Sequence, residues 1–194
     1  MSANLNIRIP EWLDKICVSP LMLYRRLKYG FSFRKIYLCE NEYTIVESAD
    51  YYKFGKFNWI FIRCNKKPYA VSEFKIGRVK TKRMYLHRAI MKPPKRRLVD
   101  HRNGDGLDNR RANLRLATRS QNACNKAKRS NASSKYFGVY FDKESCRWGT
   151  SIKHNGKTIY LGRFDNEIDA ARAHDKAARK YHKEFARLNF SEDT

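Results

Sequence analysis

Residues 98–125 read LVDHRNGDGLDNRRANLRLATRSQNACN, and this stretch decides the fold of the centre of the chain. Residues 97–101 are predicted to form a strand that ends in an Asp-His pair. The Asn-Gly and Asp-Gly dipeptides after it predict a turn, because these residues tolerate positive φ. Residues 114–117 alternate like a returning strand, and Thr118 with Gln121 has the spacing of a capping box that opens a helix. The stretch therefore predicts a strand, a loop, a second strand and a helix.

The polar residues of this stretch are those that phosphodiester hydrolysis requires. Asp100 supplies a carboxylate, which is a hard oxygen ligand that Mg²⁺ prefers, and Asn122 supplies an amide oxygen from the first turn of the helix. Strand alternation points His101 away from Asp100, where it is free to take a proton from water. Asn113 can bond a carbonyl or ring nitrogen and hold the loop of this histidine. One metal ion on a phosphate and one imidazole on a water are enough for hydrolysis.

The pattern D-H-R-N-G-D-x-L-D-N-R-x-x-N-L-R, followed by T-x-x-x-N, resembles the HNH endonucleases, the ββα-metal or His-Me finger group, in the form common among phage homing enzymes. The resemblance spans about residues 85–125. It implies that Asp100 and Asn122 hold the metal ion. It also implies that His101 is the general base and that Asn113 orients its loop. Many relatives carry His at the position of Asn122, and this departure favours Mg²⁺ or Mn²⁺ over Zn²⁺. The alternative is a turn-rich hairpin whose polar side chains only cap and bond locally.

The composition points to a polyanionic partner. The 194 residues carry a formal net charge of +23, and the excess is highest between residues 41 and 125. Such a charge favours binding to DNA with an affinity that falls steeply with salt, although a solvated basic surface or a membrane-surface protein would also be basic. No run of 18 apolar residues and no signal-peptide pattern occurs. We therefore expect a cytoplasmic protein, located in the host cytoplasm if a phage encodes it, that does not associate with a membrane. We expect it to bind double-stranded DNA as a monomer or weak dimer.

Residues 1–38 are predicted to form an N-terminal helical hairpin that is similar to a helix-turn-helix. Ser19 and Pro20 suit the N-cap and N1 positions of its second helix. In a helix-turn-helix this second helix enters the major groove, which makes Arg25 and Arg26 candidate DNA contacts. The alternative is a plain helical hairpin that packs on the next domain.

Residues 39–125 are predicted to be the nuclease domain, in which an antiparallel meander precedes the stretch quoted above. Its predicted strands are residues 43–46, 58–63, 69–72 and, in part, 79–86, with a turn at 65–68. His87 and Arg88 follow the meander and also fit the HNH pattern. Arg88 is expected to face phosphate, whereas His87 touches phosphate, supports the site or is a bonded core histidine.

Residues 126–135 are small, polar and basic and are predicted to be a linker to a C-terminal domain at residues 136–190. This domain is predicted to contain three strands, at residues 136–141, 147–153 and 158–161. Asn155-Gly156 predicts a hairpin turn, and Asp165 or Asn166 is expected to cap a helix. By strand alternation, the side chains expected to face the helix are Trp148, Thr150, Ile152, Ile159 and Leu161. The other face is expected to be basic and open, with Tyr140, Arg147, Gly149, Ser151, Lys153, Thr158 and Tyr160.

The motifs Y-F-G-V, W-G-T-S-I-K, Y-L-G-R-F-D, E-I-D-A-A-R-A-H-D-K-A-A and A-R-L-N-F make this domain similar to the AP2 DNA-binding domain of plant regulators and phage HNH enzymes. The resemblance implies that the three-stranded sheet lies in the major groove. The candidate DNA contacts are then Tyr140, Arg147, Ser151, Lys153, Thr158 and Tyr160. Plant members have base-reading arginines where this chain has Phe137, Tyr140 and Asp142, so their target sequence is not transferable. The alternative is a small sheet with a solvated outer face.

Together these patterns predict an α+β protein that is a homing-type DNA endonuclease with Mg²⁺ or Mn²⁺ as cofactor, targeted by its AP2-like domain. His101 would deprotonate the attacking water, and one site per chain should nick one strand at a time. Two rival hypotheses are a DNA-binding transcription regulator whose HNH unit is a non-catalytic scaffold, and an RNA-binding or RNA-processing protein.

Overall fold

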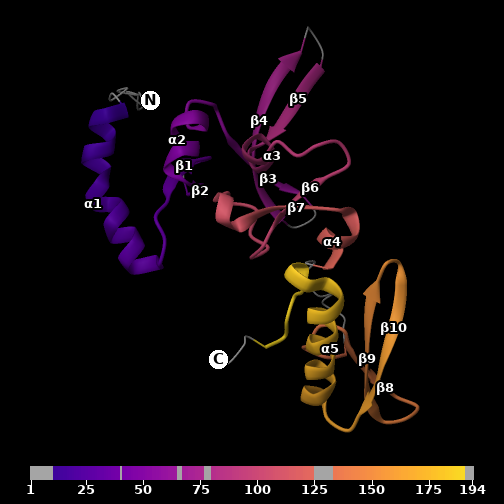
Figure 1. The fold of residues 1–194 in the computed structure, drawn as a ribbon. Coiled ribbons are helices and arrows are strands. Elements are labelled where there is room, and N and C mark those ends of the chain that lie inside the picture. Colours follow the sequence, from indigo (N-terminus) through magenta and orange to yellow (C-terminus); the bar gives the residue numbers. More distant parts are fainter. Residues whose placement is uncertain (1–10, 40, 65–66, 77–79, 125–132, 191–194) are drawn as a thin grey trace. The chain divides into compact units, whose positions relative to one another are not determined.

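The computed structural model describes residues 11–39, 41–64, 67–76, 80–124 and 133–190 (Figure 1). It is an α+β structure with several small antiparallel sheets and few helices, which confirms that part of the prediction. The chain divides into two compact units, Met1–Lys92 with Asp105–Arg115 and Pro93–Gly104 with Leu116–Thr194. Because the division crosses residues 98–125, this stretch contributes to both units. Within the described residues, no helix is both long enough and apolar enough to span a membrane.

The first unit begins with a single helix, α1 (Glu11–Tyr29), which contains Pro20 in its interior. The predicted helical hairpin, and with it the helix-turn-helix, is therefore wrong. Ser19 and Pro20 suit the start of a helix, but residues 17–19 include no Gly, Asn or Asp that would support a chain reversal. The helix instead continues through the proline, although the proline removes one backbone hydrogen-bond donor and crowds the carbonyl four residues earlier. It ends where Gly30, at φ 76°, donates its N–H to the Arg26 carbonyl oxygen over 2.9 Å.

Two small sheets follow in the first unit. The first pairs β1 (Arg34–Tyr37) with β2 (Tyr43–Val46), and the second has the order β3 (Ile60–Cys64), β4 (Lys67–Ile76) and β5 (Lys80–Tyr85). The three-stranded sheet confirms the predicted meander for its last three strands, whereas the strand at residues 43–46 pairs with β1 in a separate sheet. The sequence did not predict β1, α2 (Ser48–Phe54) or α3 (Leu86–Met91), which are too short for a reliable periodicity. Residues 65 and 66 of the predicted turn lie outside the described part of the chain, and residues 67 and 68 belong to β4 instead of a turn.

The central stretch forms the predicted strand–strand–helix order. β6 (Leu98–His101) and β7 (Leu114–Ala117) form a two-stranded sheet, and α4 (Arg119–Cys124) follows β7 directly. The capping box is confirmed at both of its hydrogen bonds. The Thr118 N–H donates to Gln121 Oε1 over 2.8 Å, and the Gln121 N–H donates to Thr118 Oγ1 over 3.2 Å. These bonds fix the start of α4 immediately after the sheet.

The C-terminal part of the second unit is a three-stranded antiparallel sheet covered by one helix. Its strand order is β10 (Lys157–Phe164), β9 (Arg147–His154) and β8 (Val139–Asp142), and α5 (Glu167–His182) leads into the short 3₁₀ helix η2 (Lys183–Phe185). Alanines allow α5 to approach the sheet closely, because Ala177 and Ala178 pack against Ile152 in the core. The helix N-cap is Asn166, one of the two predicted candidates, and its side chain accepts the Asp169 N–H.

The hairpin turn of this sheet has the predicted backbone conformation, but strand β10 contains a bulge that was not predicted. Asn155 and Gly156 both have positive φ, 49° and 80°, as a tight hairpin turn requires. In β10, however, the register shifts between Tyr160 and Gly162, and Gly162 has a φ of 127°. This β-bulge places Leu161 as an extra residue and reverses the alternation after it. The predicted linker falls largely on residues 125–132, which lie outside the described part of the chain.

Candidate active site and nucleic-acid interface

The Asp-His pair lies at the end of β6 and is buried. Asp100 is 4% exposed and His101 is 7% exposed. We expected alternation to leave the histidine open to water, and this expectation is wrong as stated. β6 pairs with β7 along one edge and contacts α4, and the burial of both Asp100 and His101 shows that neither face is open at the end of the strand. The Gly104 N–H donates to the His101 carbonyl oxygen over 2.9 Å, so a tight turn with positive φ at Gly104 follows the pair at once.

The predicted metal ligands lie on two elements that contact each other. Asp100 is on β6 and Asn122 is in the first turn of α4, which packs on β6. Asn122 is half-buried, and its N–H donates to the Thr118 carbonyl oxygen over 3.0 Å. The second unit thus brings the strand that carries Asp100 and His101 against the helix that carries Asn122.

The donor set at this position suits one class of metal ion better than another. Among the described residues, no group of three or more His, Cys, Asp or Glu side chains could hold a metal ion. A zinc site needs three or four nitrogen, sulfur or carboxylate ligands from the protein. Mg²⁺ usually takes only one or two protein oxygens and completes its shell with water and substrate phosphate. A carboxylate from Asp100 with an amide oxygen from Asn122 fits the second pattern.

Asn113 belongs to the first unit, in the 3₁₀ turn η1 (Arg111–Asn113). It is buried, and its Nδ2 donates to the Asp108 carbonyl oxygen over 2.8 Å. We expected this amide to bond a carbonyl or ring nitrogen and hold the loop of His101; the bond to Asp108 instead closes residues 108–113 into a compact turn, and a role toward His101 stays a prediction. Its N–H also donates to the Arg110 carbonyl oxygen over 2.9 Å.

Sequence reasoning missed the residues that fasten this loop to β2. Asn109 is fully buried, and its Nδ2 donates to Thr44 Oγ1 over 2.7 Å. The Thr44 hydroxyl in turn donates to the Leu107 carbonyl oxygen over 2.6 Å. Two backbone bonds, each 2.9 Å long, run from the Ile45 N–H to the Leu107 oxygen and from the Asn109 N–H to the Ile45 oxygen. Residues 107–109 are therefore held like an extra strand at the edge of β2.

A second fastening joins the loop to α2. Arg111 donates from Nε and Nη2 to the two carboxylate oxygens of Asp50, over 2.8 Å and 2.7 Å. Asp50 is only 2% exposed, and its acceptance of these hydrogen bonds raises the pKa of Arg111. The D-N-R-R run of residues 108–111 was visible in the motif, but its partner lies 61 residues earlier in the chain. No local pattern connects the two.

The remaining candidates of the first unit differ in what their side chains do. His87 is buried between Tyr69 and Tyr85, with both ring-centroid distances at 5.5 Å, which fits the core alternative. Arg88 is exposed on α3. Arg25 donates to the Phe33 carbonyl oxygen over 2.6 Å and lies over the Phe33 ring, so it secures the end of α1.

Arg26, the other candidate on α1, is exposed, although its backbone carbonyl accepts the bond that ends the helix.

The outer face of the three-stranded sheet carries the predicted nucleic-acid contacts. Tyr140, Lys153, Thr158 and Tyr160 are exposed, and Ser151 is half-buried. Arg147 is exposed as well, and its Nε lies 2.8 Å from Asp165 Oδ1. Tyr140 lies flat on the sheet because Gly149 stands opposite it in β9. A Cβ at Gly149 would lie 2.5 Å from the Tyr140 Cζ atom.

One residue of this face was not predicted. Arg163 pairs with Gly149 in the register, which puts it on the same side of the sheet as Tyr140. Uninterrupted alternation from Tyr160 would have placed it on the inner side, and the bulge at Leu161 reverses this. Gly162 in the middle of the strand was the available signal, because glycine inside a strand often marks a bulge.

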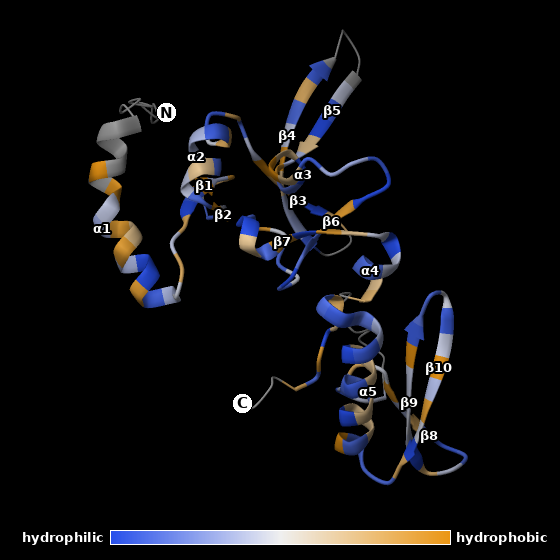
Figure 2. Ribbon diagram, in the orientation of Figure 1, coloured by the Kyte–Doolittle hydropathy of each residue, from blue (hydrophilic) through white to orange (hydrophobic). Residues whose placement is uncertain are grey.

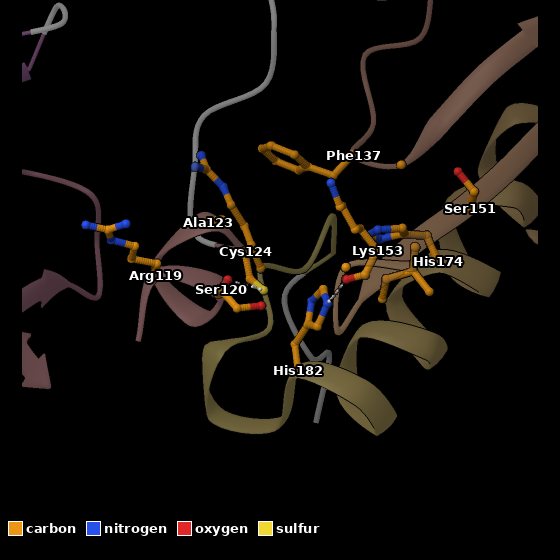
Figure 3. Close-up of a pocket in the computed structure, with 13 residues that line it drawn as sticks. Arg119, Ser120, Ala123, Cys124, Phe137, Ser151, Lys153, His174 and His182 are labelled. Atoms are coloured by element: carbon orange, nitrogen blue, oxygen red, sulfur yellow. Dashed lines mark hydrogen bonds between the residues drawn. The ribbon is translucent and has the colours of Figure 1, made fainter. Parts of the chain in front are cut away.

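Two histidines of α5 contact the sheet or the residue just before β8. His182 Nε2 donates to the Lys153 carbonyl oxygen over 2.9 Å, which ties the end of the helix to β9 (Figure 3). His174 packs on Gly138, where φ is 71° and no side chain would fit. Burial lowers the pKa of His174 below its usual value, against the opposing effect of Asp175.

Known proteins are similar to this chain both in the HNH part and in the C-terminal segment. A family model described as HNH endonuclease matches residues 93–124. The uncharacterized HNH endonuclease L560 of Acanthamoeba polyphaga mimivirus is 31% identical over 166 residues, which cover 77% of this chain and 86% of that protein. This chain therefore belongs to the HNH endonuclease family. No solved structure gives a significant match.

Plant proteins match a shorter part of the chain. APETALA2-like protein 2 of Oryza sativa subsp. indica is 46% identical over 59 residues, and the AP2-like ethylene-responsive transcription factor TOE2 of Arabidopsis thaliana is 47% identical over 58 residues. Each match covers 30% of this chain but only 14% and 12% of the plant proteins. The chain thus combines an HNH endonuclease arrangement with an AP2-like segment.

Proposed function

We propose that this protein is a metal-dependent, site-specific DNA endonuclease of the homing type, in which the AP2-like segment selects the target. One observation carries the proposal. In a chain of the HNH endonuclease family, β6 presents Asp100 and His101 in sequence beside the helix that carries Asn122. A ββα-metal layout is the arrangement that this strand, sheet partner and helix support best.

Asp100 and His101 are both nearly covered, so their surroundings hold the two side chains in place. Moving an ionised carboxylate out of water is costly unless a partner or a cation compensates it. A turn alone would not require Asp100 and His101 both to be buried in a four-residue strand.

The roles of the residues follow from their chemistry. Asp100 and Asn122 would hold Mg²⁺ or Mn²⁺, which when bound supplies positive charge for the phosphate and the leaving 3′-oxygen. His101 would accept the proton of the attacking water at a ring nitrogen. Asn113 would keep the loop of residues 108–113 in shape through its bond to Asp108. The ends produced would be a 5′-phosphate and a 3′-hydroxyl, and one site per chain would leave a nick.

Target binding would use the outer face of the β8–β10 sheet. Its tyrosines, Arg147, Lys153 and Arg163 combine aromatic surface with cationic groups, as duplex DNA contacts require. The helix α5 covers the opposite face. The outer face of the sheet is therefore the one that DNA would contact, because α5 packs on the inner face.

The test is nicking of supercoiled plasmid with Mg²⁺, comparing the wild type with His101→Ala. We expect Mg²⁺-dependent open circles that DNA ligase can reseal, and at most background with the variant. His154→Ala is the matched control, because the His154 ring stacks on Tyr181 and has no role in the proposed chemistry, so this variant should retain activity. The low exposure of His101 favours a specific rival, a DNA-binding regulator with a non-catalytic scaffold. That rival predicts equal background for wild type and His101→Ala.

A further inference from the structure

The β4–β5 pair extends past the sheet to which it belongs. β3 pairs with β4 only from Lys67 to Val71, whereas β4 and β5 remain paired as far as Ile76 and Lys80 (Figure 1). Residues 72–76 and 80–84 therefore form a two-stranded ribbon, and in the described part of the chain no third strand pairs with it. A two-stranded ribbon has little stability of its own in water. Its presence at the surface calls for a reason.

The ribbon is strongly basic. Residues 72–76 and 80–84 contain four basic residues and a single acidic one, Glu73. Glu73 pairs with Arg83 across the strands at 2.8 Å, and both side chains are exposed. Lys75 and Lys82 are exposed as well, and hydrophilic residues alternate with apolar ones along β4 (Figure 2). Lysines on an exposed strand can serve merely to prevent edge-to-edge aggregation, so charge alone does not assign a function.

A hollow at the base of the ribbon supplies the second observation. Its volume is about 540 Å³, and its lining includes Phe74, Lys82, Met84, Tyr85 and Arg88. Phe74 stands directly opposite Lys82 in the register and is 36% exposed. Arg88 comes from α3 rather than from the ribbon. Protection of a strand edge needs neither a cation from another element nor an exposed aromatic ring beside it.

The geometry points to a binding site for the DNA sugar–phosphate backbone at this ribbon and hollow, separate from the sheet of β8–β10. Lys82 and Arg88 contact phosphate oxygens, and the rings of Phe74 and Tyr85 lie against deoxyribose. This mixture of cations and apolar surface suits a chain in which charged phosphates alternate with less polar sugars. The inference rests on the proposed function, because that proposal makes DNA the substrate, and it adds where the nuclease unit itself grips the duplex.

The test measures duplex binding over a series of salt concentrations in a His101→Ala background without divalent metal, so that no cleavage interferes. The variant is Lys82→Gln with Arg88→Gln. The negative slope of log affinity against log salt should become less steep by about 1.8, which is about 0.9 for each lost phosphate contact. The matched control is Lys53→Gln with Lys56→Gln, two exposed lysines at the end of α2 and just after it in the same unit. This control removes the same charge and should leave the slope unchanged.

Hydroxyl-radical footprinting on the same DNA locates the contact. The Lys82/Arg88 variant should lose one protected segment of backbone and keep the segment that the AP2-like sheet protects. An unchanged slope and footprint would overturn the inference, and so would an equal loss with the control pair. Stronger competition by RNA than by duplex DNA would assign the ribbon to RNA instead. Plasmid nicking by the protein with His101 intact is scored separately, so failure of the nuclease proposal and failure of this one are distinguishable.

Discussion

The Asp-His strand and the AP2-like sheet place their proposed functional residues in opposite environments. Asp100 and His101 are 4% and 7% exposed, whereas Tyr140 and Tyr160 on the sheet are 41% and 55% exposed. A binding face has to meet a large partner, so its side chains stand in solvent. A reaction site acts on a few atoms, so its polar groups can be buried and held by their surroundings. Substitutions in the first region should therefore stop a reaction, and substitutions in the second should weaken binding by degrees.

The largest effect should come from Asp100→Asn, which keeps the shape of the side chain and removes its charge. The nicking rate at saturating protein should fall by about 10²- to 10⁴-fold, because the variant loses the charged ligand of the proposed ion. DNA affinity should stay the same or rise, since a carboxylate near phosphate is repulsive. Single-turnover nicking and a binding isotherm measure the two quantities. If DNA affinity fell by the same factor as the nicking rate, the proposed difference between the reaction site and the binding face would be wrong.

The next effect concerns the buried ion pair that fastens the loop of residues 107–113. Asp50→Ala should lower the free energy of unfolding by about 2 kcal/mol, because Arg111 loses both hydrogen bonds to a buried carboxylate. The exposed pair of Glu73 and Arg83 is the comparison, and Glu73→Ala should change stability by less than about 1 kcal/mol. Urea unfolding curves give both values. Equal changes would show that the burial of Asp50 does not matter to the loop.

A smaller effect should separate shape from charge on the sheet. Gly149→Ala should weaken DNA binding without changing its salt dependence, because the added methyl group displaces the Tyr140 ring and removes no charge. Lys153→Gln should weaken binding and also reduce the salt slope by about one phosphate contact. Binding isotherms at several salt concentrations distinguish the two. A changed slope for Gly149→Ala would mean that the cations of the sheet depend on the tyrosine.

The smallest effect should be a pH dependence in the AP2-like segment. Burial lowers the pKa of His174 in the folded protein, so the unfolded chain binds a proton more readily than the folded one. The stability that the neutral ring contributes is present above the unfolded pKa of about 6.5 and is lost as the pH falls below it. Thermal unfolding between neutral and acidic pH should show this decline, and His174→Gln should flatten it. A variant with the same decline would assign the pH dependence to other groups.

Local rules were sufficient wherever neighbouring residues decide the structure. Residues 43–46 and 114–117 are strands with the predicted bounds, and Thr118 with Gln121 forms both bonds of its capping box. Asn155 and Gly156 adopt the positive φ that their turn requires. In each case the information lies within four residues of chain. The same rules identified the outer face of the AP2-like sheet as far as the bulge.

The sequence was insufficient where distant contacts decide. The partner of Arg111 lies 61 residues away, and no periodicity indicates such a pair. Burial of His101 depends on α4 and β7 packing around a four-residue strand, which alternation cannot show. Pro20 within α1 gave a misleading local signal, because a good helix start is equally compatible with a helix that is already under way. The bulge at Leu161 hid Arg163 by changing the phase of the strand.

The most direct test of the central claim is chemical rescue at His101. Single-turnover nicking of supercoiled plasmid is measured for the wild type and for His101→Ala, with and without added imidazole, after confirming that both bind the plasmid equally. We predict that His101→Ala slows nicking by about 10²- to 10⁴-fold and that free imidazole restores part of the rate. Nicking by His101→Ala at the wild-type rate would contradict the assignment of this buried histidine as the base.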